Sequence, residues 1–154
     1  MNLTPRIITR LACRLILGGF FIYTGMLKAG NPVLFQQDIR NYHLLPDPWP
    51  GLVAMGLPWF EILCGLGVLV RVLYTGSLTL LSLSLVVFMG AISSAWSRNL
   101  DINCGCFGKD GTNIGYAPHL LLNTGLLAMG VWLLWDESRR RRPDSSPEAA
   151  QPAV

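Results

Sequence analysis

Two cysteines separated by one residue, Cys104 and Cys106, offer the widest choice of chemistry in this chain. They lie in segment 101–108, sequence DINCGCFG, between two long apolar runs. A pair of thiols can close a disulfide, exchange electrons with other thiols or bind a soft metal ion. A disulfide between residues i and i+2 closes a very small ring, and its strain makes it easier to reduce than a structural disulfide. The spacing therefore favours a thiol–disulfide exchange site.

Two other interpretations of the cysteine pair stay open. It could be a static disulfide that staples its loop, although so short a ring constrains few residues and stabilises little. It could also bind zinc together with His119 and His43, the two histidines of the chain, since two thiolates and two imidazoles suit that metal. Against zinc, the two cysteines are closer in sequence than those of the usual zinc motifs.

Glu61 is the second candidate, because it is a carboxylate inside a long apolar run. It follows Leu52 by nine residues, which places it about 13 Å into a helix, near the middle of a membrane core. A carboxylate at that depth needs a partner, a proton or a polar cavity. Side chains lean toward the N-terminus of their own helix, so Lys28, at the end of an oppositely directed helix, leans toward Glu61. We predict a Lys28–Glu61 pair, either structural or able to carry a proton for redox chemistry, with Asn123 as another candidate partner.

The elements that must position these residues are membrane helices. The chain has 154 residues, of which 51% are hydrophobic and 14% are charged, and this composition is too apolar for a soluble domain. A bilayer core needs about 20 apolar residues per helix. Four segments meet that length, roughly 11–27, 52–74, 76–96 and 117–135. We therefore predict an all-α, integral membrane four-helix transmembrane bundle.

The connections between these segments carry weaker signals. Residues 33–42 are amphipathic and predict a short interfacial helix in the longest loop. A very tight turn is expected near 74–76, where Gly76 follows Thr75. The first apolar segment lacks a good small-residue cleavage site, so we expect it to persist as a helix. Residues 1–136 are expected to form the membrane domain, and residues 137–154, rich in Arg, Ser, Pro and Ala, a disordered cytoplasmic tail.

The placement of positive charge predicts the orientation. With both termini inside (N-in/C-in), eight of the 12 lysines and arginines fall on the cytoplasmic side, as the positive-inside rule requires. These are Arg6, Arg10, Arg14, Arg71 and Arg139 to Arg142. The last four form a stop-transfer anchor beside anionic lipid rather than a nucleic-acid site. This orientation places Cys104 and Cys106 on the outer side, where disulfides persist.

Four sequence features together resemble one known family. They are the stretch 21–28 (FIYTGMLK), Leu45-Pro46, the stretch 57–61 (LPWFE) and the stretch 104–108 (CGCFG). Over roughly residues 8–135 the chain resembles the methylamine-utilisation protein MauE family, within the wider DoxX-like group of four-helix membrane proteins. The resemblance implies residence in the bacterial inner membrane and a role in maturing a periplasmic client. In the namesake system that client is the disulfide-rich small subunit of methylamine dehydrogenase, and thioredoxin-like partners are encoded nearby.

By this resemblance Lys28, Glu61, Cys104 and Cys106 are the site residues. The leading hypothesis is a thiol–disulfide oxidoreductase whose cysteines form a mixed disulfide with a periplasmic thioredoxin-like protein. Its electrons would pass to or from a membrane carrier such as a quinone, an expectation that rests on the need for an electron sink. Two alternatives stay open: a non-catalytic assembly factor that uses the Pro-rich loop 43–51, and the metal-binding protein described above.

Overall fold

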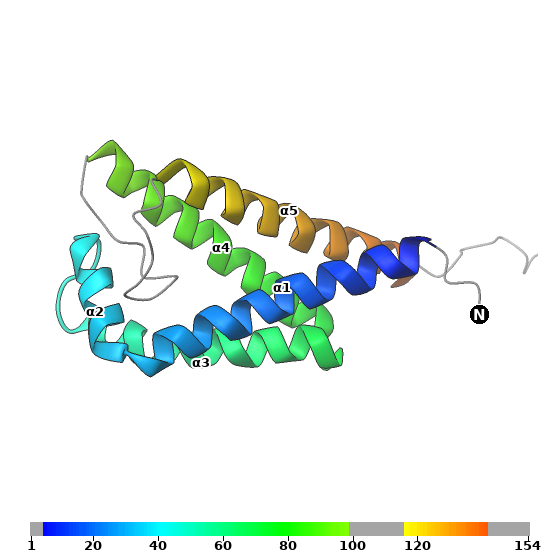
Figure 1. Ribbon diagram of the computed structural model, residues 1–154, viewed down its shortest axis with the longest axis horizontal. Coiled ribbons are helices and arrows are strands. Elements are labelled where there is room, and N and C mark those ends of the chain that lie inside the picture. Colours follow the sequence, from blue (N-terminus) through cyan, green and yellow to red (C-terminus); the bar gives the residue numbers. More distant parts are fainter. Residues whose placement is uncertain (1–4, 99–115, 142–154) are drawn as a thin grey trace, which may run out of the picture.

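The computed structural model of the protein describes residues 5–98 and 116–141 (Figure 1). These residues form five α-helices, and no strand occurs among them. The helices are α1 (Pro5–Gly30), α2 (Pro32–Asn41), α3 (Trp49–Val70), α4 (Tyr74–Ser97) and α5 (Tyr116–Arg141). Four of them, all except α2, are long and apolar enough to cross a membrane. The predicted all-α bundle with four membrane helices is confirmed, and the short helix expected at 33–42 is present as α2.

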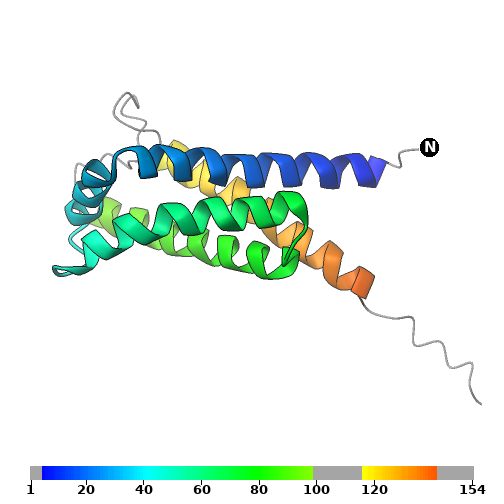
Figure 2. The same cartoon turned by 90° about the horizontal axis from the view of Figure 1, so that it is seen from below.

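The four long helices alternate in direction, and α2 lies across one end of the bundle (Figures 1 and 2). We call this end the α2 end. It holds four ends of the long helices: the C-termini of α1 and α4 and the N-termini of α3 and α5. The start of α1 and the turn between α3 and α4 lie at the opposite end, which we call the basic end. Segment 99–115, which contains both loop cysteines, therefore leaves and re-enters the described structure at the α2 end.

Helices α1 and α3 pack with their backbones in close approach, which glycines on both helices permit. A Cβ atom on Gly18 would lie 2.9 Å from the carbonyl oxygen of Gly65, and one on Gly65 would lie 2.9 Å from that of Gly18. Near the α2 end, a Cβ atom on Gly25 would lie 2.9 Å from the carbonyl oxygen of Pro58. Small residues at helix crossings allow this kind of packing in membranes. The seam fixes α1 against α3 over several turns.

Aliphatic and aromatic side chains fill the space between the long helices. Leu17, Phe21, Val68, Leu78 and Leu81 are buried there. Large apolar side chains also point outward, and Leu63 on α3 and Leu121 on α5 are 67% and 77% exposed. Such surfaces suit contact with lipid tails rather than with water.

Arginines hold the helices together at the basic end. The guanidinium of Arg14 donates hydrogen bonds to the carbonyl oxygens of Val68 (3.2 Å) and Leu69 (2.7 Å), at the end of α3. Arg10 on α1 pairs with Asp136 on α5 through a 2.6 Å hydrogen bond. The hydrogen bonds from Arg14 cap carbonyl groups at the end of α3 that have no partner within their own helix.

The predicted tight turn is present between α3 and α4, but it lies earlier in the chain than the expected residues 74–76. Tyr74 already belongs to α4, and the chain reverses at residues 71–73. Arg71 and Leu73 reverse it by adopting positive φ angles of 65° and 51°. Gly76 is the stronger turn former in the sequence, but it lies within α4.

The helices also extend beyond the apolar segments that predicted them. Helix α1 begins at Pro5, and α5 continues past Trp135 to Arg141. Ion pairs one turn apart, Arg140 with Asp136 and Arg141 with Glu137, support this last turn. The first residues of the predicted tail are thus helical, and residues 142–154 lie outside the described part.

Candidate functional site

A buried ion pair between Lys28 and Glu61 joins α1 to α3 near the α2 end. The Lys28 Nζ atom donates hydrogen bonds to both carboxylate oxygens of Glu61, at 2.7 Å to Oε1 and 2.8 Å to Oε2. The side chains are 3% and 0% exposed. The predicted Lys28–Glu61 pair is therefore present, and it is closed off from the surface.

The α1–α3 seam explains why these two residues meet. Gly25 lies one turn before Lys28, and a Cβ atom there would lie 3.4 Å from the Cβ of Glu61. The two backbones are thus so close at this level that the lysine side chain spans the remaining gap. Because α1 and α3 are antiparallel, both side chains lean toward the same level of the bundle. The glycine packing positions the pair.

Two aromatic rings flank the ammonium group. The Lys28 Nζ atom lies 4.7 Å from the centre of the Phe88 ring on α4 and 5.3 Å from that of Phe35 on α2. Both distances fit cation–π interactions, which strengthen when the cation is desolvated. Phe35 is 6% exposed, so α2 covers the pair from the α2 end. We call Lys28, Glu61, Phe35 and Phe88 the ion-pair cage.

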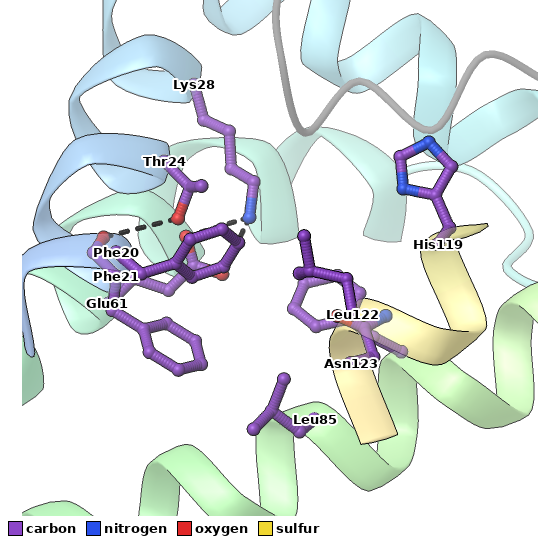
Figure 3. A pocket seen from close by; sticks show the side chains of 10 residues that line it. Phe20, Phe21, Thr24, Lys28, Glu61, Leu85, His119, Leu122 and Asn123 are labelled. Carbon is purple, nitrogen blue, oxygen red and sulfur yellow. Dashed lines mark hydrogen bonds and ion pairs between the residues drawn. The ribbon is translucent and has the colours of Figure 1, made fainter. Parts of the chain in front are cut away.

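A small cavity of about 20 Å³ adjoins the cage (Figure 3). His119 and Asn123, from the first turns of α5, line it across from Lys28 and Glu61. Thr24 of α1 adds a hydroxyl group, and the rest of the lining is apolar: Phe20, Phe21, Leu85, Phe88 and Leu122. The cavity brings polar side chains of α1, α3 and α5 to one place.

The cavity does not fit a quinone ring. Pockets for organic ligands usually measure about 300–1,000 Å³, whereas this one is about 20 Å³. It has room for at least one water molecule. No redox step is therefore assigned to a quinone at this position.

The other predicted site residues fall into two groups. Cys104 and Cys106 lie outside the described residues. His119 lines the cavity, whereas His43 is exposed in the turn after α2. Within residues 5–98 and 116–141 no three His, Cys, Asp or Glu side chains are grouped to hold a metal. A zinc site that uses Cys104 and Cys106 is not tested by these residues.

Sequence reasoning did not identify Phe35 or Phe88 as parts of the site. Phe35 is the one buried residue of α2, and the amphipathic pattern of that helix could have singled it out. Phe88 belongs to the apolar helix α4, where no periodic pattern marks the inward face. Cys64, one turn after Glu61, is 8% exposed and packs in the apolar core.

A family model described as "Methylamine utilisation protein MauE" matches residues 6–136. The chain belongs to the MauE family. Among curated proteins it is similar to the methylamine utilization protein MauE of Paracoccus denitrificans, with 30% identity over 97 residues. That match covers 62% of this chain and 52% of the relative, so the chain spans about half the length of the MauE protein it matches. No solved structure matches the chain. In this MauE-family member, the matched range includes the ion-pair cage, the cavity and both loop cysteines.

Proposed function

We propose that this MauE-family protein is a bacterial inner-membrane thiol–disulfide redox protein that supports maturation of a periplasmic client. Cys104 and Cys106 are its exchanging pair. The observation that carries the proposal concerns the described helices on either side of the cysteines: α4 ends and α5 begins at the α2 end. His119 and Asn123 of α5 line the cavity beside the buried Lys28–Glu61 pair. We therefore propose that the thiol pair acts at the same end of the bundle as the intramembrane ion pair.

The proposed orientation is N-in/C-in, with the α2 end facing the periplasm. Arginines of α1, of the α3–α4 turn and of the last turn of α5 gather at the basic end. The positive-inside rule assigns such an end to the cytoplasm. The loop cysteines then face an oxidising compartment and can meet a thioredoxin-like partner.

The exchange chemistry balances without a bound cofactor. A thiolate of the client attacks the Cys104–Cys106 disulfide, forming a mixed disulfide and releasing one loop cysteine as a thiolate. The second client thiolate attacks the mixed disulfide, so the client gains a disulfide and the loop pair becomes a dithiol. A partner disulfide then reoxidises the loop pair by the same two steps and is itself reduced. Two electrons pass from the client to the partner, and the protons of the client thiols end on the partner thiols.

The Lys28–Glu61 pair has two roles in this proposal. It holds α1 and α3 together at the level of the cage, and Glu61 takes up and returns a proton while the loop thiols change ionisation. A carboxylate inside the membrane that faces a polar cavity is suited to this second role. Glu61 meets that condition, since it contributes to the cavity lining.

The test compares two double variants of the full chain in its own host. Cys104→Ser/Cys106→Ser should leave client disulfides incomplete, whereas Cys13→Ser/Cys64→Ala should not. The proposed client is a methylamine dehydrogenase small subunit, and mass spectrometry of its alkylated peptides reads the disulfides directly. Immunoblotting checks that both variants accumulate in the membrane. Normal client disulfides in the loop variant would refute the redox proposal.

A second candidate function is a non-catalytic assembly factor, which one observation favours. The Pro-rich loop after α2 is fastened at the α2 end, where Arg98 donates a 2.7 Å hydrogen bond to the carbonyl oxygen of Tyr42 and Arg40 pairs with Asp47 at 2.8 Å. Leu44 and Leu45 are exposed on it. A fastened loop with exposed leucines suits partner binding. If Leu44→Ser/Leu45→Ser abolished client maturation and Cys104→Ser/Cys106→Ser did not, the assembly role would replace the redox role.

A further inference from the structure

We propose that the cavity beside the ion-pair cage binds one ordered water molecule between Lys28 and Asn123. This water is the route by which protons reach Glu61. The water site follows from the geometry of the described residues, whereas its use as a proton route rests on the proposed redox function.

The ammonium group of Lys28 supplies the first partner for this water. A lysine ammonium has three hydrogen-bond donors. Two of them are directed at Oε1 and Oε2 of Glu61, at 2.7 Å and 2.8 Å. The rings of Phe35 and Phe88 flank the nitrogen but offer no oxygen acceptor. The third donor needs an acceptor, because a buried N–H group without one is costly.

The opposite wall of the cavity supplies the second partner. Asn123 is 9% exposed and lines the cavity from α5 (Figure 3). Its amide carries both an acceptor and donors, so it can bond to a water that also accepts from Lys28. The Thr24 hydroxyl donates to the carbonyl oxygen of Phe21 at 3.4 Å, which leaves its oxygen able to accept from the same water.

The size and lining of the cavity fit at least one water molecule. About 20 Å³ is open to the centre of a water molecule, so a water enters without displacing the lining. Cavities lined only by apolar groups stay dry, whereas buried waters usually make about three hydrogen bonds. Lys28, Asn123 and Thr24 supply three polar groups. The water is therefore held rather than merely accommodated.

The same water connects Glu61 to the α2 end. His119 lies one turn before Asn123 on α5, closer to that end, and is partly exposed. The proposed water accepts from the Lys28 ammonium and from the Asn123 amide nitrogen, so its two hydrogens can be donated to Thr24 and to a Glu61 oxygen. A proton that passes His119 then reaches the carboxylate through this water. The opposite direction is closed by apolar core, where Leu17 and Leu81 are 1% and 0% exposed. Glu61 thus exchanges protons with the side of the membrane that the α2 end faces.

The lysine content of the chain makes a direct test possible. Lys28 and Lys109 are its two lysines, so Lys109→Arg leaves Lys28 as the single ¹⁵N-lysine signal. In the full chain reconstituted in lipid bilayers, proton-detected solid-state NMR measures magnetisation transfer from water to this ammonium and its exchange rate. We expect a water contact in the Lys109→Arg protein. An ammonium signal without any water contact would overturn the proposal.

Variants of the cavity wall sharpen the test. Asn123→Leu fills the site and removes a partner, so exchange should slow at least about tenfold, which corresponds to about 1.4 kcal/mol. Thr124→Leu, which introduces leucine at the adjacent exposed position, should leave exchange unchanged. If Asn123→Leu does not fold, Thr24→Val makes the test from α1, since valine keeps the shape and removes the hydroxyl. Unchanged exchange in the folded wall variant would refute the site.

A variant of the loop cysteines distinguishes failure of the water site from failure of the proposed redox function. Cys104→Ser/Cys106→Ser, combined with Lys109→Arg, should retain the water contact, because it leaves the three proposed partners of the water, Lys28, Asn123 and Thr24, unchanged. If client disulfides proved independent of the loop cysteines while the water contact persisted, the redox function would fail and the water site would stand. Loss of the contact in this variant would contradict the water site as argued here.

Discussion

Replacing Lys28 with methionine should destabilise the folded bundle by about 3–5 kcal/mol, because it leaves a buried charge without a partner. The geometry sets the size of the effect. Both carboxylate oxygens of Glu61 accept from Nζ, at 2.7 Å and 2.8 Å, and the Glu61 side chain is 0% exposed. Methionine keeps most of the length of the side chain, so the loss is electrostatic rather than a loss of volume.

The double variant Lys28→Met/Glu61→Leu should be far less destabilised than Lys28→Met. Replacing both members of a buried pair with apolar groups of similar size is often neutral or stabilising. The two single variants and the double variant form a thermodynamic cycle whose coupling energy measures the pair. Reversible unfolding in detergent micelles, followed by circular dichroism, gives the free energies.

An exposed ion pair provides the matched control. Arg40 and Asp47 are also 2.8 Å apart, but their side chains are 53% and 69% exposed. Arg40→Met should therefore cost only about 0–1 kcal/mol. If Lys28→Met cost no more than Arg40→Met, or if the double variant cost as much as the two single variants summed, the burial argument would be refuted.

Three further outcomes follow from other parts of the structure, each measured by the same unfolding assay. Gly25→Ala should destabilise the bundle by about 1–3 kcal/mol because the new Cβ would meet α3. Gly19→Ala should be neutral or stabilising, because no atom lies within 4 Å of the new Cβ. Equal effects of the two variants would contradict the close packing of α1 against α3. Arg14→Met should cost about 1.5–3 kcal/mol through the lost hydrogen bonds to the end of α3, and Arg6→Met, at an exposed position, should cost much less. Burial raises the pKa of Asp38 in α2, so the folded state holds that proton more tightly and stability should fall as pH rises from about 4. Asp38→Asn should lessen this fall, and an unchanged pH profile would show that Asp38 does not cause it.

The membrane fold and the Lys28–Glu61 ion pair could both be predicted from the sequence, and each prediction has a physical reason. The apolar runs specify spanning helices by length alone. The depth of Glu61 and the opposite directions of two successive helices bring Lys28 toward it. The short length of α2 followed from its amphipathic pattern.

Other features could not be read from the sequence because they depend on packing. Phe88 lies on a helix whose lipid-facing and inward faces are both apolar, so no periodicity marks it as part of the cage. Leu73 carries one of the two positive φ angles of the α3–α4 turn, although leucine gives no turn signal and Gly76 does. The end of α5 depends on Asp136 and Glu137, whose pairs with later arginines extend the helix beyond its apolar run.

The proposed disulfide exchange by Cys104 and Cys106 on the periplasmic side can be followed in intact cells through the redox state of this pair. The chain has four cysteines, so the variant Cys13→Ser/Cys64→Ala retains only the two loop cysteines. Acid quenching, then alkylation with a reagent that adds mass, separates oxidised from reduced protein on a gel. Labelling with a membrane-impermeant maleimide shows which side of the inner membrane the two cysteines face. Disulfide exchange should give a mixture of oxidised and reduced protein that labels from outside and that shifts when reductant is added or a thioredoxin-like partner is deleted. A pair that stays oxidised under every condition, or that labels only after the inner membrane is broken, would rule out this exchange.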